Sequence, residues 1–327
     1  MIEIEQSAAL NSIQDLGRYD WRDSGVSVSG AMDSLALRAG NILLNNAENM
    51  AAIEVQIFPF RVKFHQPTTI AITGADCRTL LNGQPLLPWC VRPIAAGDIV
   101  EMRFPTQGAR GYLCVAGGID VPEVLGSRST ALRGEFGGYH GRPLRRGDKI
   151  KFGATRQPTL PQMGLSIAPP ELAMAEYFPK LDQNDLLVRV IPSGEFTLFT
   201  ADSQRIWQQS WEISLQSNRT GYRLSGQPLR ASETIELRSY GLIPGIIQVP
   251  PAGEPIIQLS DANTAGGYPK LACVIEQDLW RLAQLPPGKT LRLVESTVAQ
   301  ARDIAIAIER WLLGLKDCMR LWANSGR

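Results

Sequence analysis

The residues best suited to chemistry gather in the second half of the chain. The run SNRTGYRL places Asn218, Arg219 and Arg223 around a glycine, and a later apolar run ends in the loop SDANTAGGYP. This loop offers the carboxylate of Asp261 and the hydroxyl of Thr264 on a backbone that turns freely. Such a combination is what a site needs when it must approach a planar amide closely.

We expect these groups to line one cleft. A polar side chain beside apolar strands and glycine turns costs roughly 1–3 kcal/mol unless it meets backbone, water or ligand. Two arginines near a carboxylate-bearing loop suit a small zwitterionic or anionic amide. An elaborate turn capped by Asp261 is the alternative interpretation, because Asx turns use the same residue types. The predicted substrate-binding residues are Asn218, Gln248, Thr264, Gly266, Gly267 and Tyr268.

A cluster of positive charge lies in the first half. Between residues 128 and 156, eight arginines and lysines stand against two acidic residues around the glycine-rich run GEFGGYHGR. One interpretation is an anion-binding concavity in which Arg128, His140, Arg142 and backbone amides hold a phosphate or a carboxylate. The other is a solvated surface loop, because runs of charge usually face water.

Several familiar sites are excluded. Five cysteines without C-x-x-C spacing and only two histidines do not make a Cys/His zinc site, so no metal site is predicted. The chain has no G-x-S-x-G nucleophile elbow. The run LPPGKT is not a phosphate-binding P-loop, because Pro286 and Pro287 lack the N–H groups that such a loop presents and a strand-like run follows.

The elements that must position these residues are mostly short strands. A turn followed by a strand recurs at 95–98, at 145–148 and, more weakly, at 285–288. Short β-branched or aromatic runs bounded by turn residues predict strands at 62–64, 69–73, 99–104 and 111–116.

Helices are expected at a few places only. Asp33 is the predicted N-cap of a helix at 34–44, and Asp202 is the predicted N-cap of a helix at 203–207. Residues 270–284 fit either a strand followed by a short helix, which we favour, or one helix. The predicted helices are 34–44, 171–177, 203–207 and an amphipathic C-terminal helix at 297–322.

Composition favours a mainly β protein with a few helices. The chain has 30 glycines and 22 prolines in 327 residues, about 16% against a usual share of roughly 12%, which means many turns. The net charge of +1 disfavours nucleic acid as a partner. The acidic N-terminus lacks a signal-peptide pattern and no apolar run is long enough for a membrane span. Together with the odd number of cysteines, which never have C-x-x-C spacing, this predicts a cytoplasmic location.

The chain is expected to form two β-rich domains. Residues 154–187 hold five prolines and no sustained period, which is typical of a linker. The predicted division is residues 1–155, a linker at 156–187, a second domain at 188–296 and a C-terminal helix and tail at 297–327.

The chain resembles the KipA-type family, also called biotin-dependent carboxyltransferase or allophanate hydrolase subunit 2. Within that family it is most similar to the C subunits of 5-oxoprolinases. The matching segments span residues 13 to 288 in order and include IQDLGRYDWRDSGVSVSGAMD, YLCVAGGIDVPEVLGSRST, SNRTGYRLSG and IIQVPPAGEPIIQLSDANTAGGYP.

The resemblance implies a cyclophilin-like β-barrel in the second domain and a subunit of an ATP-dependent enzyme. That enzyme would open 5-oxo-L-proline to L-glutamate with the help of two partner subunits, one of the KipI type and one of the LamB/YcsF type. Because this chain lacks a nucleotide-binding motif, we expect ATP to be bound by a partner or at a shared interface. The chain alone is expected to be inactive.

For this reaction, residue type and position suggest roles for individual residues. Arg219 and Arg223 would hold the substrate carboxylate or developing phosphate charge, and Asp261 would act as a base or orient water. Backbone N–H groups near Gly266 and Gly267 would meet an oxyanion. Three positions depart from the family pattern, and one of them lies inside the site loop: Asp20, Thr220 and Ala265.

Two other functions remain open. The chain could be the carboxyltransferase component of a biotin-dependent urea or amide carboxylase, although it has no Met-Lys-Met acceptor and cannot carry biotin itself. It could also be a non-catalytic regulator that binds a KipI-type partner.

Overall fold

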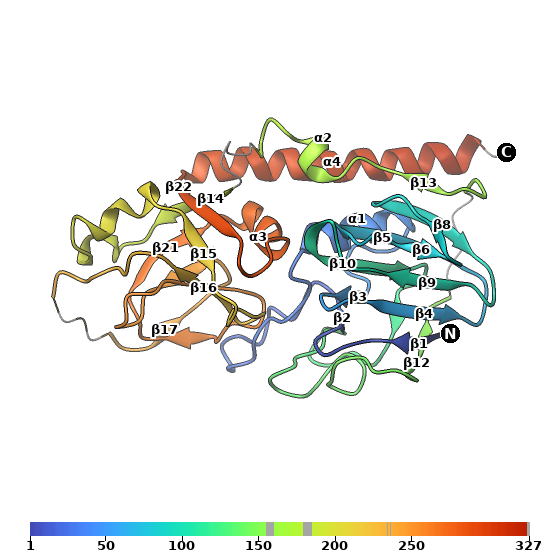
Figure 1. Cartoon of the computed structure of the whole chain (residues 1–327), viewed down its shortest axis with the longest axis horizontal. Helices are drawn as coiled ribbons and strands as arrows, with labels where there is room; N and C mark the ends of the chain where they lie inside the picture. Colours follow the sequence, from blue (N-terminus) through green and yellow to red (C-terminus); the bar gives the residue numbers. More distant parts are fainter. Residues whose placement is uncertain (155–159, 179–184, 234, 236, 326–327) are drawn as a thin grey trace. The chain divides into compact units, whose positions relative to one another are not determined.

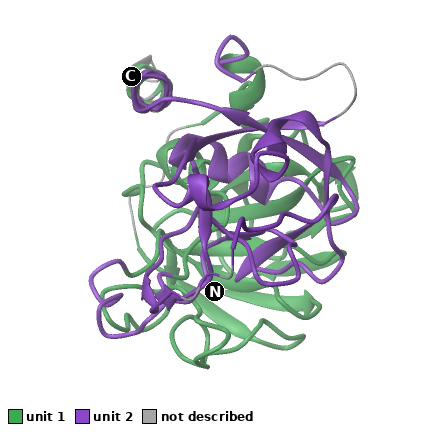
Figure 2. Cartoon of the chain, turned by 90° about the vertical axis from the view of Figure 1, so that its left-hand side faces the viewer, with its two compact units in different colours: residues 1–18, 29–173, 309–327 green, residues 19–28, 174–308 purple. Residues whose placement is uncertain are grey.

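The computed structural model describes residues 1–154, 160–178, 185–233, 235 and 237–325, and most of its elements are short strands (Figure 1). The chain divides into two compact units, each made of separate segments (Figure 2). The first unit comprises residues 1–18, 29–173 and 309–327, and the second comprises 19–28 and 174–308.

This division differs from the predicted domains. Residues 19–28 belong to the second unit, and part of the predicted linker is structured within the first. There, β13 (Leu165–Ser166) pairs with β8 (Cys90–Ile94). Linker positions 174–178 and 185–187 belong to the second unit, and positions 156–159 and 179–184 lie outside the described residues.

In the described part of the first unit, two sheets enclose one hydrophobic core. Ile2, Ile4, Phe60 and Phe64 from one sheet are fully buried with Ile72 and other residues of the second sheet. One sheet runs in the order β11 (Ile119–Asp120), β12 (Lys149–Phe152), β1 (Ile2–Gln6), β4 (Phe60–Phe64), β9 (Ile99–Met102), β6 (Leu80–Leu81) and β7 (Gln84–Pro85). The other runs in the order β13, β8, β5 (Thr68–Asp76), β10 (Gln107–Val115), β3 (Ala52–Val55) and β2 (Ser12–Gln14).

Helix α1 (Ser34–Leu43) packs against β5 and β10. Its predicted N-cap is confirmed, because the carboxylate of Asp33 accepts a hydrogen bond from the Ala36 amide at 2.8 Å. Thr73 of β5 donates its hydroxyl to the Ala36 carbonyl at 2.7 Å. The helix is thus fixed to the sheet by hydrogen bonds as well as by apolar packing.

The second unit is built on a closed β-barrel, as the resemblance implied. Its strands are β14 (Leu186–Pro192), β21 (Lys270–Val274), β18 (Ile246–Gln248), β19 (Ile256–Gln258), β16 (Gly221–Ser225), β15 (Trp211–Ile213) and β22 (Thr290–Glu295), in that order. A two-stranded ribbon is formed by β17 (Tyr240–Gly241) and β20 (Ala265–Gly266). The favoured reading of residues 270–284 is confirmed, since β21 is followed by α3 (Glu276–Ala283).

The predicted C-terminal helix is confirmed as α4 (Val298–Ser325), the longest helix of the described chain. Thr297 and Gln300 form a reciprocal capping box at its start: the Gln300 amide donates to the Thr297 hydroxyl and the Thr297 amide donates to the Gln300 side chain. In the first unit, Trp311 of α4 contacts Trp89 edge-on at 6.2 Å between ring centroids.

Two predicted helices are shorter or different. The helix expected at 171–177 is only α2 (Pro170–Ala173). The segment after Asp202 is the 3-10 helix η2 (Ser203–Gln208), which follows another 3-10 turn, η1 (Phe196–Leu198). Asp202 makes no capping hydrogen bond there, and Arg205 has non-helical torsion angles. The Ser203 hydroxyl instead accepts a hydrogen bond from the Arg230 amide at 2.7 Å, which connects η2 to a segment later in the chain.

The recurring turn has the same geometry in all three places. Gly97, Gly147 and Gly288 each donate their N–H to a strand residue, namely Phe64, Ile4 and Ile213. Each of those strand residues donates its own N–H back to the residue that follows the glycine. The sequence repeat therefore marks a repeated way of joining a turn to a neighbouring strand.

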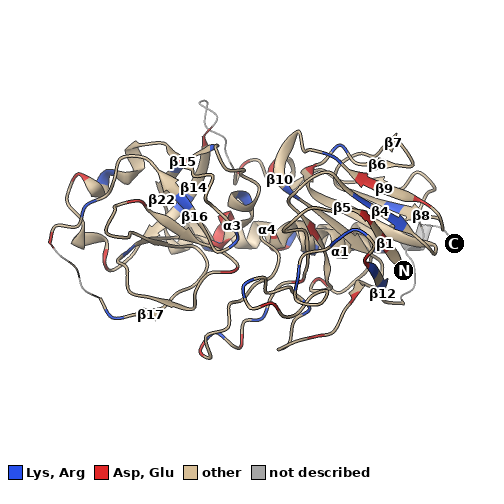
Figure 3. Ribbon diagram, turned by 60° about the horizontal axis from the view of Figure 1, so that its bottom comes forward, with Lys and Arg blue, Asp and Glu red and all other residues tan. Residues whose placement is uncertain are grey.

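Basic and acidic residues are interspersed along both units (Figure 3). No helix in the part of the chain that the structure describes is long and apolar enough to cross a membrane.

Candidate functional site

The barrel register places a row of side chains on one face of four neighbouring strands. Arg223 of β16 is opposite Ile256 of β19, Ile256 is opposite Gln248 of β18, and Gln248 is opposite Lys270 of β21. Residues opposite each other in a sheet share a face. A β-bulge in the β18–β21 pair brings Lys270, the first residue of its strand, into this register. We call these four residues the barrel row.

The opposite face of the same strands is the barrel core. A second row of cross-strand partners forms it, and each member is at most 1% exposed: Tyr222, Ile257, Ile247 and Ala272. Because side chains alternate between faces along a strand, the barrel row lies on the outside of the barrel.

Lys270 is the most unusual member of the barrel row. Its side chain is buried, with the residue 3% exposed. The ammonium donates to the Gly266 carbonyl at 2.9 Å and lies 3.1 Å from the centroid of the Tyr240 ring. Desolvation lowers the pKa of Lys270, against the opposing effect of Glu195. A buried lysine with a lowered pKa is a common feature of functional sites.

Glu195 holds the groups around this lysine. One of its carboxylate oxygens accepts the Lys270 backbone amide at 2.6 Å, and the other accepts the Tyr240 hydroxyl. Partial desolvation and then the Glu195 hydrogen bond raise the pKa of Tyr240. The tyrosine is therefore kept neutral as a donor to Glu195.

Two glutamines connect the barrel row to the β17–β20 ribbon. Gln258 donates to the Gln248 side chain at 3.2 Å, and Gln248 donates to the Tyr268 carbonyl at 3.3 Å. A Cβ atom on Gly266 would lie 2.8 Å from the Gln248 amide nitrogen. The ribbon therefore packs directly on the buried amides, and a larger residue in place of Gly266 would have to displace the Gln248 side chain.

Arg219 and Asp261, both predicted as catalytic, meet in a buried bidentate ion pair. The two hydrogen bonds measure 2.9 and 3.1 Å, and the Asp261 amide also donates to the Arg219 carbonyl at 3.0 Å. The residues are 4% and 7% exposed. A carboxylate held in this way joins two loops, and its oxygens are already used by the guanidinium.

The other predicted residues are more exposed. The side chain of Asn218 accepts the Thr220 amide at 2.8 Å, as in an Asx turn, and Arg223 and Tyr268 face solvent. Thr264 lines a narrow crevice with Arg22, whose guanidinium donates to the Leu242 carbonyl. Gly267 lies close to the Leu237 carbonyl. Of the predicted set, Gly266 accepts the hydrogen bond from the Lys270 ammonium, and Gln248 is the register partner of Lys270.

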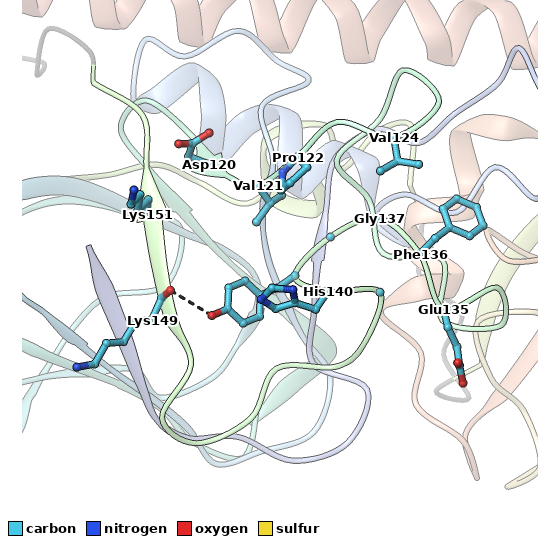
Figure 4. A pocket seen from close by; sticks show the side chains of 13 residues that line it. Asp120, Val121, Pro122, Val124, Glu135, Phe136, Gly137, His140, Lys149 and Lys151 are labelled. Atoms are coloured by element: carbon cyan, nitrogen blue, oxygen red, sulfur yellow. Dashed lines mark hydrogen bonds between the residues drawn. The ribbon is translucent and has the colours of Figure 1, made fainter.

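In the first unit, the two arginines of the predicted anion site are paired with aspartates. The Arg128 guanidinium pairs with Asp120 at 3.2 Å, and Arg142 forms two 2.8 Å hydrogen bonds to Asp148. Burial opposes ionisation of Asp148, yet the hydrogen bonds from Arg142 and the Arg145 amide leave its pKa lowered. Neither arginine lines the adjacent hollow, whereas His140 does (Figure 4).

Glu195, Tyr240, Gln258 and Lys270 were not predicted as site residues. They come from four separate segments, and only the barrel register and the ribbon bring them together. The lysine directly after the loop TAGGYP was the one sequence feature that could have indicated them.

The sequence matches a known family over most of its length. Residues 24–295 match the family described as "Carboxyltransferase domain, subdomain A and B". The chain is 38% identical to the C subunit of 5-oxoprolinase from Escherichia coli over 302 residues, which are 92% of this chain and 93% of that protein. It is 40% identical to the Haemophilus influenzae protein of the same name, over 93% and 94% of the two chains.

A solved structure has the same fold. The urea amidolyase from K. lactis superposes with a TM-score of 0.85 at 30% identity, over 96% of this chain. The match covers only 20% of that longer enzyme.

Proposed function

The chain belongs to the family of the carboxyltransferase domain, subdomains A and B, and from this premise we propose that it is the C subunit of a 5-oxoprolinase. The complex would use ATP to open 5-oxo-L-proline to L-glutamate in the cytoplasm. The chain would work with two partner subunits, one of the KipI type and one of the LamB/YcsF type. ATP would be bound by a partner or at a shared interface.

This proposal rests on similarity to 5-oxoprolinase C subunits over nearly the full length of both proteins. The relatives named as C subunits of 5-oxoprolinase share 38% and 40% identity, and the matches cover 93% and 94% of their lengths. The match to the fungal urea amidolyase covers a fifth of a longer chain at 30% identity. The proposal therefore follows the relatives of matching length.

The barrel row supplies chemistry that suits a lactam. A lactam is a weak electrophile, so its oxygen must be activated, by phosphorylation from ATP, before water opens the ring. In that step the lactam oxygen forms a bond to the γ-phosphorus and ADP leaves, so the negative charge lies on the transferred phosphoryl group. A desolvated ammonium such as Lys270 would stabilise that charge more strongly than an exposed one. The exposed guanidinium of Arg223 would pair with the substrate carboxylate.

Reconstitution tests the proposal. The chain is expressed in Escherichia coli that lacks the C subunit of its own 5-oxoprolinase, and glutamate release from 5-oxo-L-proline is measured in extracts with and without ATP. We expect ATP-dependent release to be restored, and the chain alone to release none. If the chain co-purifies with the bacterial partner subunits but no glutamate forms, the proposal is wrong.

Carboxyl transfer is the second candidate, supported by the family match and by the similarity to urea amidolyase. Its test is the transfer of carboxyl from free carboxybiotin to urea by the purified chain. Turnover there without oxoprolinase activity in the reconstituted complex would favour this candidate.

A further inference from the structure

The ammonium of Lys270 is covered by the side chain of Tyr240, which belongs to β17 at the edge of the second unit (Figure 1). Lys270 is 3% exposed, whereas Tyr240 is 45% exposed. The ammonium lies 3.1 Å from the centroid of the tyrosine ring, so the ring separates it from solvent. A substrate cannot contact the ammonium while the ring is in this position. The role proposed above for Lys270 therefore requires that the ring moves.

Two polar contacts hold the ring in place. The Tyr240 hydroxyl donates to one carboxylate oxygen of Glu195, and the face of the ring attracts the ammonium. The other Glu195 oxygen accepts the Lys270 backbone amide at 2.6 Å. Glu195 is thus anchored to the barrel strand independently of the tyrosine and stays in position when the hydroxyl leaves. Because nearly half of Tyr240 is exposed, rotation of its side chain breaks few apolar contacts.

The backbone next to Tyr240 is fixed more firmly than its ring. Leu242 is 2% exposed, its amide donates to the Thr264 carbonyl at 2.9 Å, and its carbonyl accepts the Arg22 guanidinium. Lifting the ribbon off the barrel would break these contacts. Rotation about χ1 of the exposed tyrosine leaves them intact. The smallest movement that uncovers Lys270 is therefore a change of one side-chain rotamer.

We propose that Tyr240 is a gate residue, whose rotation controls the access of substrate to Lys270. The inference rests on the proposed function for the identity of the substrate. In the closed position the ring keeps water away from the ammonium, as a lid does in other active sites. A group that is reachable only in an open state reacts in proportion to the fraction of time that this state is populated.

Acylation of the purified full chain measures this access. The probe is sulfo-N-hydroxysuccinimide acetate, which reacts with neutral amines, and mass spectrometry identifies the labelled lysines. Rates are followed from about pH 7 to about pH 10, which separates the reactivity of the neutral amine from its pKa. The exposed Lys289 is the internal reference. We expect Lys270 to react at least about tenfold more slowly, as for a gate that is open about a tenth of the time or less.

Matched tyrosine variants identify the gate. Tyr240→Ala removes the ring and should raise the rate at Lys270 at least about tenfold, whereas Tyr240→Phe removes only the hydrogen bond to Glu195 and should raise it about two- to fivefold. Tyr268→Ala is the control, because this tyrosine is 49% exposed and its carbonyl, not its ring, accepts Gln248. The control should change the rate less than about twofold.

Three outcomes would overturn the inference. One is labelling of Lys270 in the unaltered chain as fast as that of Lys289. Another is an equal rise in the Tyr240→Ala and Tyr268→Ala variants, which would show general loosening of the ribbon. The third is an unchanged rate in Tyr240→Phe, which decides the matter if Tyr240→Ala does not fold.

The gate and the proposed function fail separately. If the reconstituted complex releases glutamate and Lys270 is labelled freely in the unaltered chain, the gate is wrong although the activity stands. If the labelling follows the expected order but the complex is inactive, the gate stands and the proposed function fails.

Discussion

At the scale of single residues, the second unit contains two kinds of buried charge. Asp261 and Arg219 neutralise each other through two hydrogen bonds, whereas Lys270 relies on one carbonyl and one aromatic ring. The sequence predicted Arg219 and Asp261 because they flank glycine turns. It did not single out Lys270, because an isolated lysine after a loop usually faces solvent and only strand pairing decides whether it is buried.

Lys270→Met should separate activity from stability. Methionine has a similar length and no charge, so it removes the desolvation cost that lowers the pKa of Lys270. We expect at least a tenfold loss of glutamate release in the reconstituted complex, about 1.4 kcal/mol in the barrier, with no fall in melting temperature. Lys289→Met, at an exposed position, is the control. Full activity of the Lys270 variant would exclude a role for the ammonium.

The lowered pKa of Lys270 also has a predictable effect on stability. Below its lowered pKa the lysine is protonated in both folded and unfolded chains, so its desolvation cost is constant. Between that pKa and the ordinary value of 10.5, the unfolded chain binds more protons and folding is favoured as pH rises. In urea titrations, the stability of the unaltered chain relative to Lys270→Met should therefore increase with pH in this window. A difference that stays constant up to pH 10.5 would contradict the lowered pKa.

Asp261→Asn should act mainly on stability. The change removes the charge from the carboxylate that accepts two hydrogen bonds from the Arg219 guanidinium, and breaking a buried pair typically costs about 3–5 kcal/mol. Urea unfolding should report a loss of this size, against a small change for the exposed Asp303→Asn on α4. A variant as stable as the parent but inactive would instead restore Asp261 as a catalytic base.

At the scale of elements, sequence patterns predicted those strands and helices that depend on nearby residues. The strands near Val62 and Tyr112, the capped helix α1 and the long helix α4 all follow from residue type and period. The segment after Asp202 did not follow its pattern, because Ser203 bonds to Arg230, a residue distant in sequence. The ribbon over the barrel was missed for the same reason, since β17 and β20 are short and far apart in the chain.

The start of α4 offers a test of such local control. Thr297→Ala removes the hydroxyl that caps the Gln300 amide, and loss of an N-cap typically costs about 0.5–2 kcal/mol. Chemical denaturation should show a loss in this range without a change in the fold seen by circular dichroism. Gln300→Ala removes the reciprocal bond to the Thr297 amide and should also destabilise. No loss in either variant would mean that tertiary packing alone fixes the helix end.

At the scale of the whole molecule, each unit is assembled from segments that are distant in sequence. The sequence predicted two β-rich parts, but it placed residues 19–28 in the first, because nothing in their composition indicates the later barrel segments that they join. In the second unit these residues contribute the buried side chain of Val28 and the hydrogen bond from Arg22 to Leu242.

Residues 19–28 should therefore be part of what stabilises the second unit. A fragment of residues 174–308 is compared with the same fragment joined through a flexible linker to residues 19–28. Burying Val28 alone is worth roughly 1.5–3 kcal/mol, so the extended fragment should have the higher melting temperature. Equal melting temperatures would show that the segment only rests on the unit's surface.

The interleaving of the two units also limits how a gene of this kind can be cut and rejoined. The chain passes from one unit to the other after residues 18, 28, 173 and 308, so no single cut yields one complete unit. A gene fusion or an exchange between relatives keeps both units intact only if the transferred segment includes all four points at which the chain crosses between units. The two units are therefore expected to be inherited as one cassette, whether as a separate subunit or within a longer multifunctional chain.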